Sequence, residues 1–530
     1  MNWKILGLDP EFLKDFKKIT IAILAAIAVG RFVGGPVLAL ISLLGIQYAS
    51  SKKTGYAVIC YLLIPFLTNL AGQLVSHGNA FMAFNKICSV AMMGMMIMLA
   101  NGGRGKKKLP ITLLFAYLVV AAISSMQGWC PIISYLKLIL FTLFLIGIIF
   151  MASAMQNSER ALIQVRAAFM AFSVVLILGS FVTLFVPGIG YSMYNRFAFN
   201  GESITFEELG DGLVLFSGVT LHSQALAPMI ACFNAWVLCD MLFVQKRFTK
   251  LHLMMLVLAP FLLYKTHSRT GLVAYIGSMA MIIFFSIPKA RMTAWFKLKV
   301  MKMMYGMVAL LVLVSIVMEI NNHTISSWLR KRDASQVVDD DRGLMEAITA
   351  SRQDSNNQNL HDFHQNPLLG MGFQTMEWHA VAYHAGTISI WSAPIEKGVM
   401  PLMILGETGV VGAIVFVAFL FCFYGVCFTQ RYAALMSTFT AVLVSNLGEA
   451  TFFSPTATGG IVLVEALVGG FCIDLLSQRQ NRMAMPFQFR ALYPMQTPHF
   501  VPPQNMMRPP HFVPPPHRMP MPPVRGRSVR

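Results

Sequence analysis

The sequence predicts an all-α fold, a polytopic bundle of about 12–14 membrane-spanning helices. Apolar residues make up 56% of the 530 residues and charged residues only 12%, which is about half the ~25% of a soluble domain. The apolar residues also gather in runs of the length that a helix needs to cross a bilayer. This composition excludes a soluble enzyme, a fibrous repeat protein and a wholly disordered chain.

The first two apolar runs are short and share the Gly-rich stretch 33–36, so they form either one hairpin or one long broken span. We expect the first span to be retained rather than cleaved as a signal peptide. The chain is charged up to Lys18 and its first apolar run has no small-residue cleavage site. The expected spans lie near residues 18–31, 34–50, 55–73, 79–100, 109–127, 132–154, 162–187, 219–244, 251–265, 271–288, 299–320, 398–427, 431–448 and 456–477.

Lysines and arginines concentrate in alternate loops. Because translocating these charges is costly, the positive-inside rule assigns those loops and both termini to the cytoplasm. The net charge of +18 is therefore a topology signal, helped by anionic membrane lipids, and no nucleic-acid partner is predicted. The opposite, extracytoplasmic face receives the loops 188–218 and 321–397, where we expect the chemistry. The basic loops are 52–53, 104–108, 246–250 and 289–302.

The sequence divides into a transmembrane domain, 1–477, and a basic tail, 478–530. The tail is rich in Pro, Met and Arg and repeats itself as Pro498–Pro503 and Pro510–Pro515. It lacks the apolar content to fold, so we expect a disordered cytoplasmic tail. Such a tail either contacts lipid headgroups or binds a partner through its Pro motifs.

Two arginines and a histidine lie beside predicted spans on the expected outer face. Arg269 is either an interfacial side chain that snorkels to water or a ligand for an anion such as phosphate, which its planar fork suits. Arg196 lies in the 188–218 loop. His222 precedes a helix start, where free N–H groups favour an anion, although Ser223 fits the same place as an ordinary cap.

The 321–397 loop supplies further polar candidates. Within it, His361 and His364 are three residues apart, but two imidazoles without a third ligand at a suitable spacing do not predict a metal site. The Met-rich stretch 92–98 is interpreted as apolar packing rather than copper ligation. Neither a metal nor a cofactor is predicted. The other candidates in the loop are Arg342, His379, His384, Glu396 and Lys397.

Four regions of the sequence together resemble the bacterial O-antigen ligase and Wzy-type polymerase superfamily of multi-spanning glycosyltransferases. They occur in the order found in that family and span residues 190–412. The segments are Arg196–Gly201 with His222–Ala227, Ser268–Gly271, Asn366–Gly372 and Leu405–Gly412.

The resemblance implies a glycosyltransferase-C-like fold in the bacterial cytoplasmic (inner) membrane. It also implies transfer of a glycan from a polyprenyl-diphosphate carrier to an acceptor hydroxyl outside that membrane. Ligase and polymerase differ only in the acceptor, a lipid, a protein or another glycan unit. Cationic side chains would neutralise the diphosphate without a metal ion. The expected diphosphate-binding residues are Arg196, Arg269, Arg342, Lys397 and His222.

The catalytic base stays open among three residues. Ligases of this family carry a catalytic His shortly before the helix with the Leu-x-Glu-x-Gly pattern, whereas the corresponding place here, 395–400, has no His. The acceptor hydroxyl needs a base within hydrogen-bond reach. His384, Glu396 and His379 are the candidates.

A secondary transporter or lipid flippase is the alternative function. Such proteins place charges and broken helices within the bilayer, often in two repeated halves. The sequence is interpreted as having few ionisable residues inside its spans, with Lys137 as one, and no internal repeat. The enzyme is therefore favoured. A membrane scaffold that acts through the Pro-rich tail is a third hypothesis.

Overall fold

The structure is a computed structural model. By its contacts the chain divides into two units, Met1–Asn481 and Arg482–Arg530, and the elements below belong to the first, apart from the last two residues of the final helix. The expected spans at 34–50 and 79–100, those at 55–73 and 299–320 apart from Phe66 and Lys302, and the Pro-rich repeats lie outside the described residues. The structure describes residues 10–32, 66, 109–186, 190–193, 214–220, 222–283, 298, 302, 353–386, 398–448, 450–455 and 458–483.

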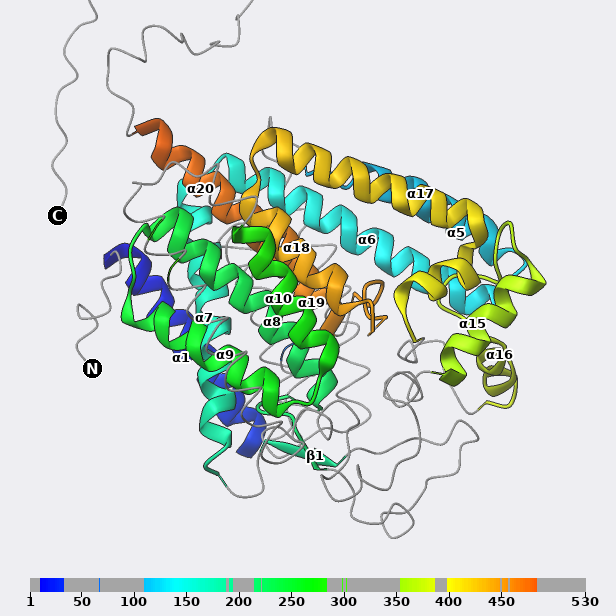
Figure 1. The fold of residues 1–530 in the computed structure, drawn as a ribbon, viewed down its shortest axis with the longest axis horizontal. Helices are drawn as coiled ribbons and strands as arrows, with labels where there is room; N and C mark the ends of the chain where they lie inside the picture. The colour runs from blue at the N-terminus through cyan, green and yellow to red at the C-terminus, as the bar shows by residue number, and fades with distance from the viewer. Residues whose placement is uncertain are drawn as a thin grey trace, which may run out of the picture. The chain divides into compact units, whose positions relative to one another are not determined.

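The described part is mostly helical, which confirms the all-α prediction in its coarse form (Figure 1). Its one sheet is an antiparallel pair of three-residue strands, β1 (Tyr191–Met193) and β2 (Val214–Phe216). The helices before residue 300 are α1 (Pro10–Phe32), α5 (Thr112–Ser125), α6 (Pro131–Gln156), α7 (Glu159–Thr183), α8 (Ser223–Cys239) with the π-helix η2 (Asp240–Gln245), α9 (Lys250–Lys265) and α10 (Arg269–Met281). The later helices are α15 (Gln353–Gln365), α16 (Glu377–His384), α17 (Met400–Gln430), α18 (Ala433–Ser445), α19 (Thr458–Val464), the π-helix η5 (Glu465–Gly469) and α20 (Gly470–Met483).

Five helices of the described part are long and apolar enough to cross a membrane, judged by length and composition. The described residues are thus those of a membrane protein. Side chains such as Ile414, Val417 and Phe421 on α17 are exposed, as expected of a helix that faces lipid. The five segments are Pro131–Gln156, Glu159–Thr183, Ser223–Gln245, Met400–Gln430 and Thr458–Asn481.

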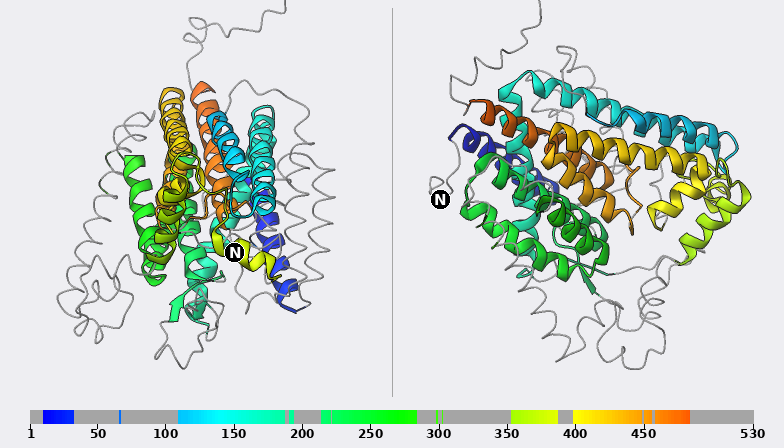
Figure 2. Two further views of the ribbon diagram at one scale, coloured as in Figure 1. Left: turned by 90° about the vertical axis from the view of Figure 1, so that its right-hand side faces the viewer. Right: turned by 45° about the horizontal axis from the view of Figure 1, so that its top comes forward.

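Helix α8 lies in the interior of the bundle. It packs against α7, α9, α10, α18 and α19, and every side chain from Ser223 to Cys239 except that of Gln224 is buried. Helices α5, α6 and α17 lie side by side, with α15 seated on α17 (Figures 1 and 2). An aromatic cluster joins α5, α6 and α17 to the loop after α18; its rings are Tyr117, Phe141, Phe416, Phe452 and Phe453.

The connections between helices gather at two ends of the bundle. At one end the Lys246 ammonium donates to Asn481 Oδ1 (2.9 Å) and the Arg479 guanidinium donates to the Gln156 carbonyl (2.6 Å). This basic end joins α6, η2 and α20. Its assignment to the cytoplasm stays a prediction. The opposite end carries the turns that hold the candidate site.

The interpretation that few ionisable residues lie inside the spans is wrong. Isolated acidic and basic side chains are buried within the apolar helices, where packing against other helices supplies partners that an apolar run does not reveal. Arg166 of α7, for example, donates two hydrogen bonds to the Asp240 carboxylate (2.6 and 3.0 Å). The buried ionisable residues of the five membrane-type segments include Lys137, Arg166, Asp240, Glu407, Glu465 and Asp474.

Candidate functional site

The segment Asn366–Thr375, here called the strap, follows α15 and pairs with helix α17. Asn366–Gly372 and Leu405–Gly412, two of the segments that resemble the glycan-transferase superfamily, are thereby joined by backbone hydrogen bonds. The bonds run from the amides of Val410 to Pro367 O (2.8 Å), Val411 to Leu368 O (3.2 Å), Met371 to Gly406 O (2.8 Å) and Gly372 to Glu407 O (3.1 Å).

The strap replaces helical hydrogen bonds that a break in α17 removes. Gly409 has φ +62° and ψ −165°, outside the helical region. In an unbroken helix the amides of residues 410 and 411 would donate to the carbonyls of residues 406 and 407. Here those amides donate to the strap, and the strap donates to those carbonyls. A break inside a membrane helix is tolerated because the freed groups are satisfied within the protein.

Side chains of α5 and α6 hold the strap from its other side. The Ser124 hydroxyl donates to the Glu407 carbonyl and accepts from the Gly372 amide (3.0 Å). The Lys137 ammonium donates to the Gln374 carbonyl (3.0 Å), and the hydroxyls of Ser134 and Thr375 lie 2.9 Å apart. The strap is thus bound to the membrane-type helices α6 and α17 and to the shorter apolar helix α5.

Helix α15 is fixed next to the strap. The Trp129 indole, in the turn between α5 and α6, donates to the buried Asp362 carboxylate (3.0 Å). The Val399 amide, just before α17, donates to Asn356 Oδ1 (3.3 Å). Both flanks of the segment 377–397 are therefore anchored at one end of the bundle.

The N-termini of α8 and α10 lie side by side. A Cβ added to Gly271 would come within 2.6 Å of the Ala227 Cβ, so the absence of a side chain permits this close approach. His222 is the N-cap of α8, and its Nδ1 accepts from the Ala225 amide (3.0 Å). The cap is therefore His222 rather than Ser223. Arg269 is the first residue of α10 and is half-buried.

The same end of the bundle holds the strap and Arg269. Gly448, after α18, contacts Thr270 of α10. The Met400 amide at the start of α17 donates to the Asn446 carbonyl (3.1 Å). The start of α10, the end of α18 and the start of α17 are therefore neighbours. This end carries the N-termini of two helices and a guanidinium, a combination that suits an anion.

The structure leaves the catalytic base open. His384 is the last residue of α16 and is exposed, and His379 lies on the same helix. His361 and His364 are exposed on α15, where His361 Nε2 lies 2.9 Å from Gln365 Nε2. Figure 1 shows α16 next to α15 rather than next to α8 and α10. The predicted residues outside the described part are Arg196, Arg342, Glu396 and Lys397.

Several residues of this end were not singled out from the sequence. Ser124 and Ser125 end an apolar run two residues before the Gly-Trp-Cys-Pro turn, and two adjacent small polar residues there were the available signal. Asp362 is surrounded by polar residues in the sequence, so nothing distinguished it. Glu407 was noted only as part of a motif; it is buried near Tyr117.

No protein-family model matches this sequence, and no curated protein is similar to it. The resemblance to the glycan-transferase superfamily therefore depends on the motifs themselves and on their placement in the fold.

Proposed function

We propose that the protein is a membrane glycosyltransferase of the O-antigen ligase or polysaccharide polymerase type. It moves a glycan from a polyprenyl-diphosphate carrier to an acceptor hydroxyl on the extracytoplasmic face of a bacterial inner membrane, on a glycosyltransferase-C-like fold. The observation that carries the proposal is that those motif segments which the structure describes gather at one end of the bundle. His222, Arg269 and the strap-bound Gly406–Val411 come from three distant parts of the sequence.

In the proposed reaction the acceptor oxygen attacks the anomeric carbon and the bond to the diphosphate oxygen breaks. The leaving diphosphate gains negative charge. The Arg269 guanidinium and the positive ends of the α8 and α10 dipoles would stabilise that charge, because such interactions strengthen as the charge develops. Arg196, Arg342 and Lys397 are the further proposed cationic ligands.

The acceptor proton must pass to a base as the new glycosidic bond forms. The three candidates, His379, His384 and Glu396, lie in the segment between the strap and α17. Because both flanks of this segment are anchored, its side chains can reach only the nearby end of the bundle. We therefore propose that the strap positions the loop that supplies the base.

The test is a transfer assay with purified full-length protein in nanodiscs, a polyprenyl-diphosphate-linked oligosaccharide and a glycan acceptor. Arg269→Ala is expected to lower the rate of transfer at least tenfold, and Arg269→Lys is expected to restore it in part because it keeps the charge but not the planar fork. Arg247→Ala, an exposed arginine at the opposite end, is the matched control and keeps the wild-type rate. Undiminished transfer by Arg269→Ala contradicts the proposal.

A proton- or ion-coupled transporter is the second candidate. The observation that favours it is the set of buried ionisable residues in the apolar helices together with the break at Gly409, because transporters combine these two features. Ion-coupled uptake of a solute or lipid into proteoliposomes, with no glycan transfer, would favour the transporter over the enzyme.

A further inference from the structure

Glu465 is an acidic residue inside the most thoroughly buried region of the bundle. It opens the π-helix η5, within the membrane-type segment Thr458–Asn481. Its side chain has no exposed surface. Neither carboxyl oxygen has a well-formed hydrogen bond with a described residue, and the donor recorded beside the carboxyl is the weakly polar Cys232 thiol.

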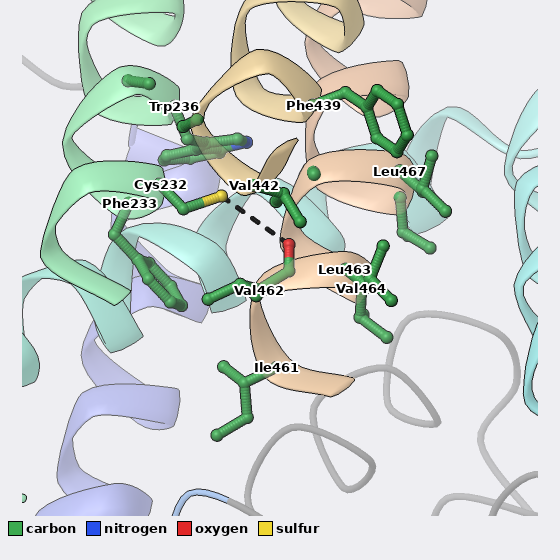
Figure 3. Close-up of a cluster of buried hydrophobic side chains, with 14 of the residues drawn as sticks. Cys232, Phe233, Trp236, Phe439, Val442, Ile461, Val462, Leu463, Val464 and Leu467 are labelled. Carbon is green, nitrogen blue, oxygen red and sulfur yellow. Dashed lines mark hydrogen bonds between the residues drawn. The ribbon is translucent and has the colours of Figure 1, made fainter. Parts of the chain in front are cut away.

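The donors around Glu465 are used by backbone carbonyls. The Cys232 thiol of α8 lies beside the carboxyl but donates to the Val462 carbonyl (3.6 Å), as Figure 3 shows. The Thr438 hydroxyl of α18 donates to the Ala466 carbonyl (3.0 Å). Both donors therefore bond to backbone carbonyls of the segment that carries Glu465, one in α19 and one in η5.

The wall next to this site is apolar. Trp236 of α8 packs directly against Gly469, where a Cβ would lie 3.0 Å from the indole nitrogen. Figure 3 shows Phe233, Val462 and Leu467 in the same cluster. Among the residues that the structure describes, the titratable neighbours of the carboxyl are two thiols of α8, Cys232 and Cys239.

Asp474, on the next helix of the same segment, provides the contrast. Its carboxylate accepts the backbone amides of Ala434 (3.0 Å) and Leu435 (2.9 Å) at the start of α18. Those bonds and the helix N-terminus stabilise a negative charge. Glu465 has no such donors, and a bare ionised carboxylate in apolar surroundings is far less stable than the neutral acid.

We propose that Glu465 is a proton-binding site of the bundle, a carboxylic acid that keeps its proton at neutral pH between α8, α18 and η5. Release of the proton would leave a charge that needs new hydrogen bonds, from water or from a shift of η5. A π-turn is a one-residue bulge in a helix, so a small change of register is the natural response. This site is independent of the proposed glycan transfer.

The test is infrared difference spectroscopy on the full-length protein in a detergent without ester groups, at pH 7. The carbonyl stretch of a protonated carboxyl absorbs apart from ionised carboxylates and amides. The spectrum of the wild type minus that of Glu465→Gln is expected to show one protonated-carboxyl band, which shifts in D₂O. Asp474→Asn is the matched control and should leave the band in place. Absence of the band from the difference spectrum overturns the proposal.

Thermal unfolding distinguishes a proton bound at Glu465 from a metal cation bound there. Gln reproduces the size and neutrality of the protonated acid, so Glu465→Gln is expected to keep the wild-type melting temperature; failure to fold would overturn the proposal. A melting temperature that rises with NaCl but not with choline chloride, in the wild type and not in Glu465→Gln, would also overturn it, because the ligand would then be a metal cation.

Discussion

The amide of Val410 donates to the carbonyl of Pro367 at 2.8 Å, in place of the carbonyl four residues earlier in its own helix. The bond connects the broken helix α17 with the strap. Because the strap also bonds to α5 and α6, the break in α17 becomes the point where four segments meet. The conformation of one glycine, Gly409, makes this junction possible.

Gly409→Ala is expected to destabilise the junction. Its positive φ is strained for any residue with a Cβ, at about 1–3 kcal/mol, and the added Cβ would overlap the backbone of Leu368. We expect a lower melting temperature and loss of slow amide exchange in the strap. Gly425→Ala, in the same helix with nothing within 4 Å of the added Cβ, is the control and should raise stability by about 0.5–1 kcal/mol. Equal effects of the two substitutions would contradict this account of the junction.

Lys137→Met is expected to loosen the strap without unfolding the bundle. The substitution removes the donor to the Gln374 carbonyl, and a buried carbonyl without its partner costs about 1–3 kcal/mol. Hydrogen exchange at the amides of Met371 and Gly372 should accelerate about tenfold or more. Lys250→Met, at an exposed lysine, should leave that exchange unchanged. Wild-type protection in Lys137→Met would show that the lysine does not hold the strap.

The buried ion pair of Asp240 is expected to contribute far more to the free energy of unfolding than the exposed pair of Glu11. Asp240→Asn leaves the Arg166 charge buried without its carboxylate, which costs about 3–5 kcal/mol. Glu11→Gln breaks the exposed pair with Arg160, which also contacts Asp15, and exposed pairs contribute about 0–1 kcal/mol. Urea or thermal unfolding of both variants measures the difference. A small loss in Asp240→Asn would mean that water reaches the Arg166 guanidinium.

We expect the protein to lose stability at alkaline pH because of Tyr432, which lies between α17 and α18. Burial, with the negative Asp474 nearby, raises the pKa of Tyr432 to about 12. The unfolded chain would release this proton near the ordinary value of about 10. The folded state therefore binds more protons between pH 10 and pH 12, so its free energy of unfolding falls as the pH rises through that range. Tyr432→Phe should show a smaller fall from pH 10 to pH 12, and an identical pH profile would contradict the shift.

The sequence predicted the helices well where apolar runs are bounded by turn residues. Residues 109–127, 132–154 and 251–265 were expected as spans, and helices α5, α6 and α9 occupy nearly the same ranges. The length and composition of an apolar run suffice to predict such helices, because a helix satisfies its own backbone hydrogen bonds. The break at Gly409 was not predicted, because its apolar surroundings indicate one continuous helix.

The pairing of the strap with α17 could not be predicted from local patterns, because it joins backbone groups about 40 residues apart, well beyond the reach of helix periodicity. The motifs indicated that Arg269, the strap and Glu407 belong to one functional region, but not which atoms meet. The number of ionisable residues inside the spans was underestimated for a related reason. Asp240 and Glu465 each stand alone in an apolar run, and only the packing of other helices shows whether such a residue has a partner.

The most direct test of the central claim is the affinity of the protein for a polyprenyl diphosphate without its glycan. We propose equilibrium binding of a radiolabelled polyprenyl diphosphate to the wild type, Arg269→Ala and Arg247→Ala in nanodiscs. A charge-assisted hydrogen bond contributes about 1.5–3 kcal/mol, so Arg269→Ala should raise the Kd about tenfold to a hundredfold, while Arg247→Ala keeps the wild-type Kd. Equal affinities of all three proteins, or a loss only in Arg247→Ala, would contradict a diphosphate site at the start of α10.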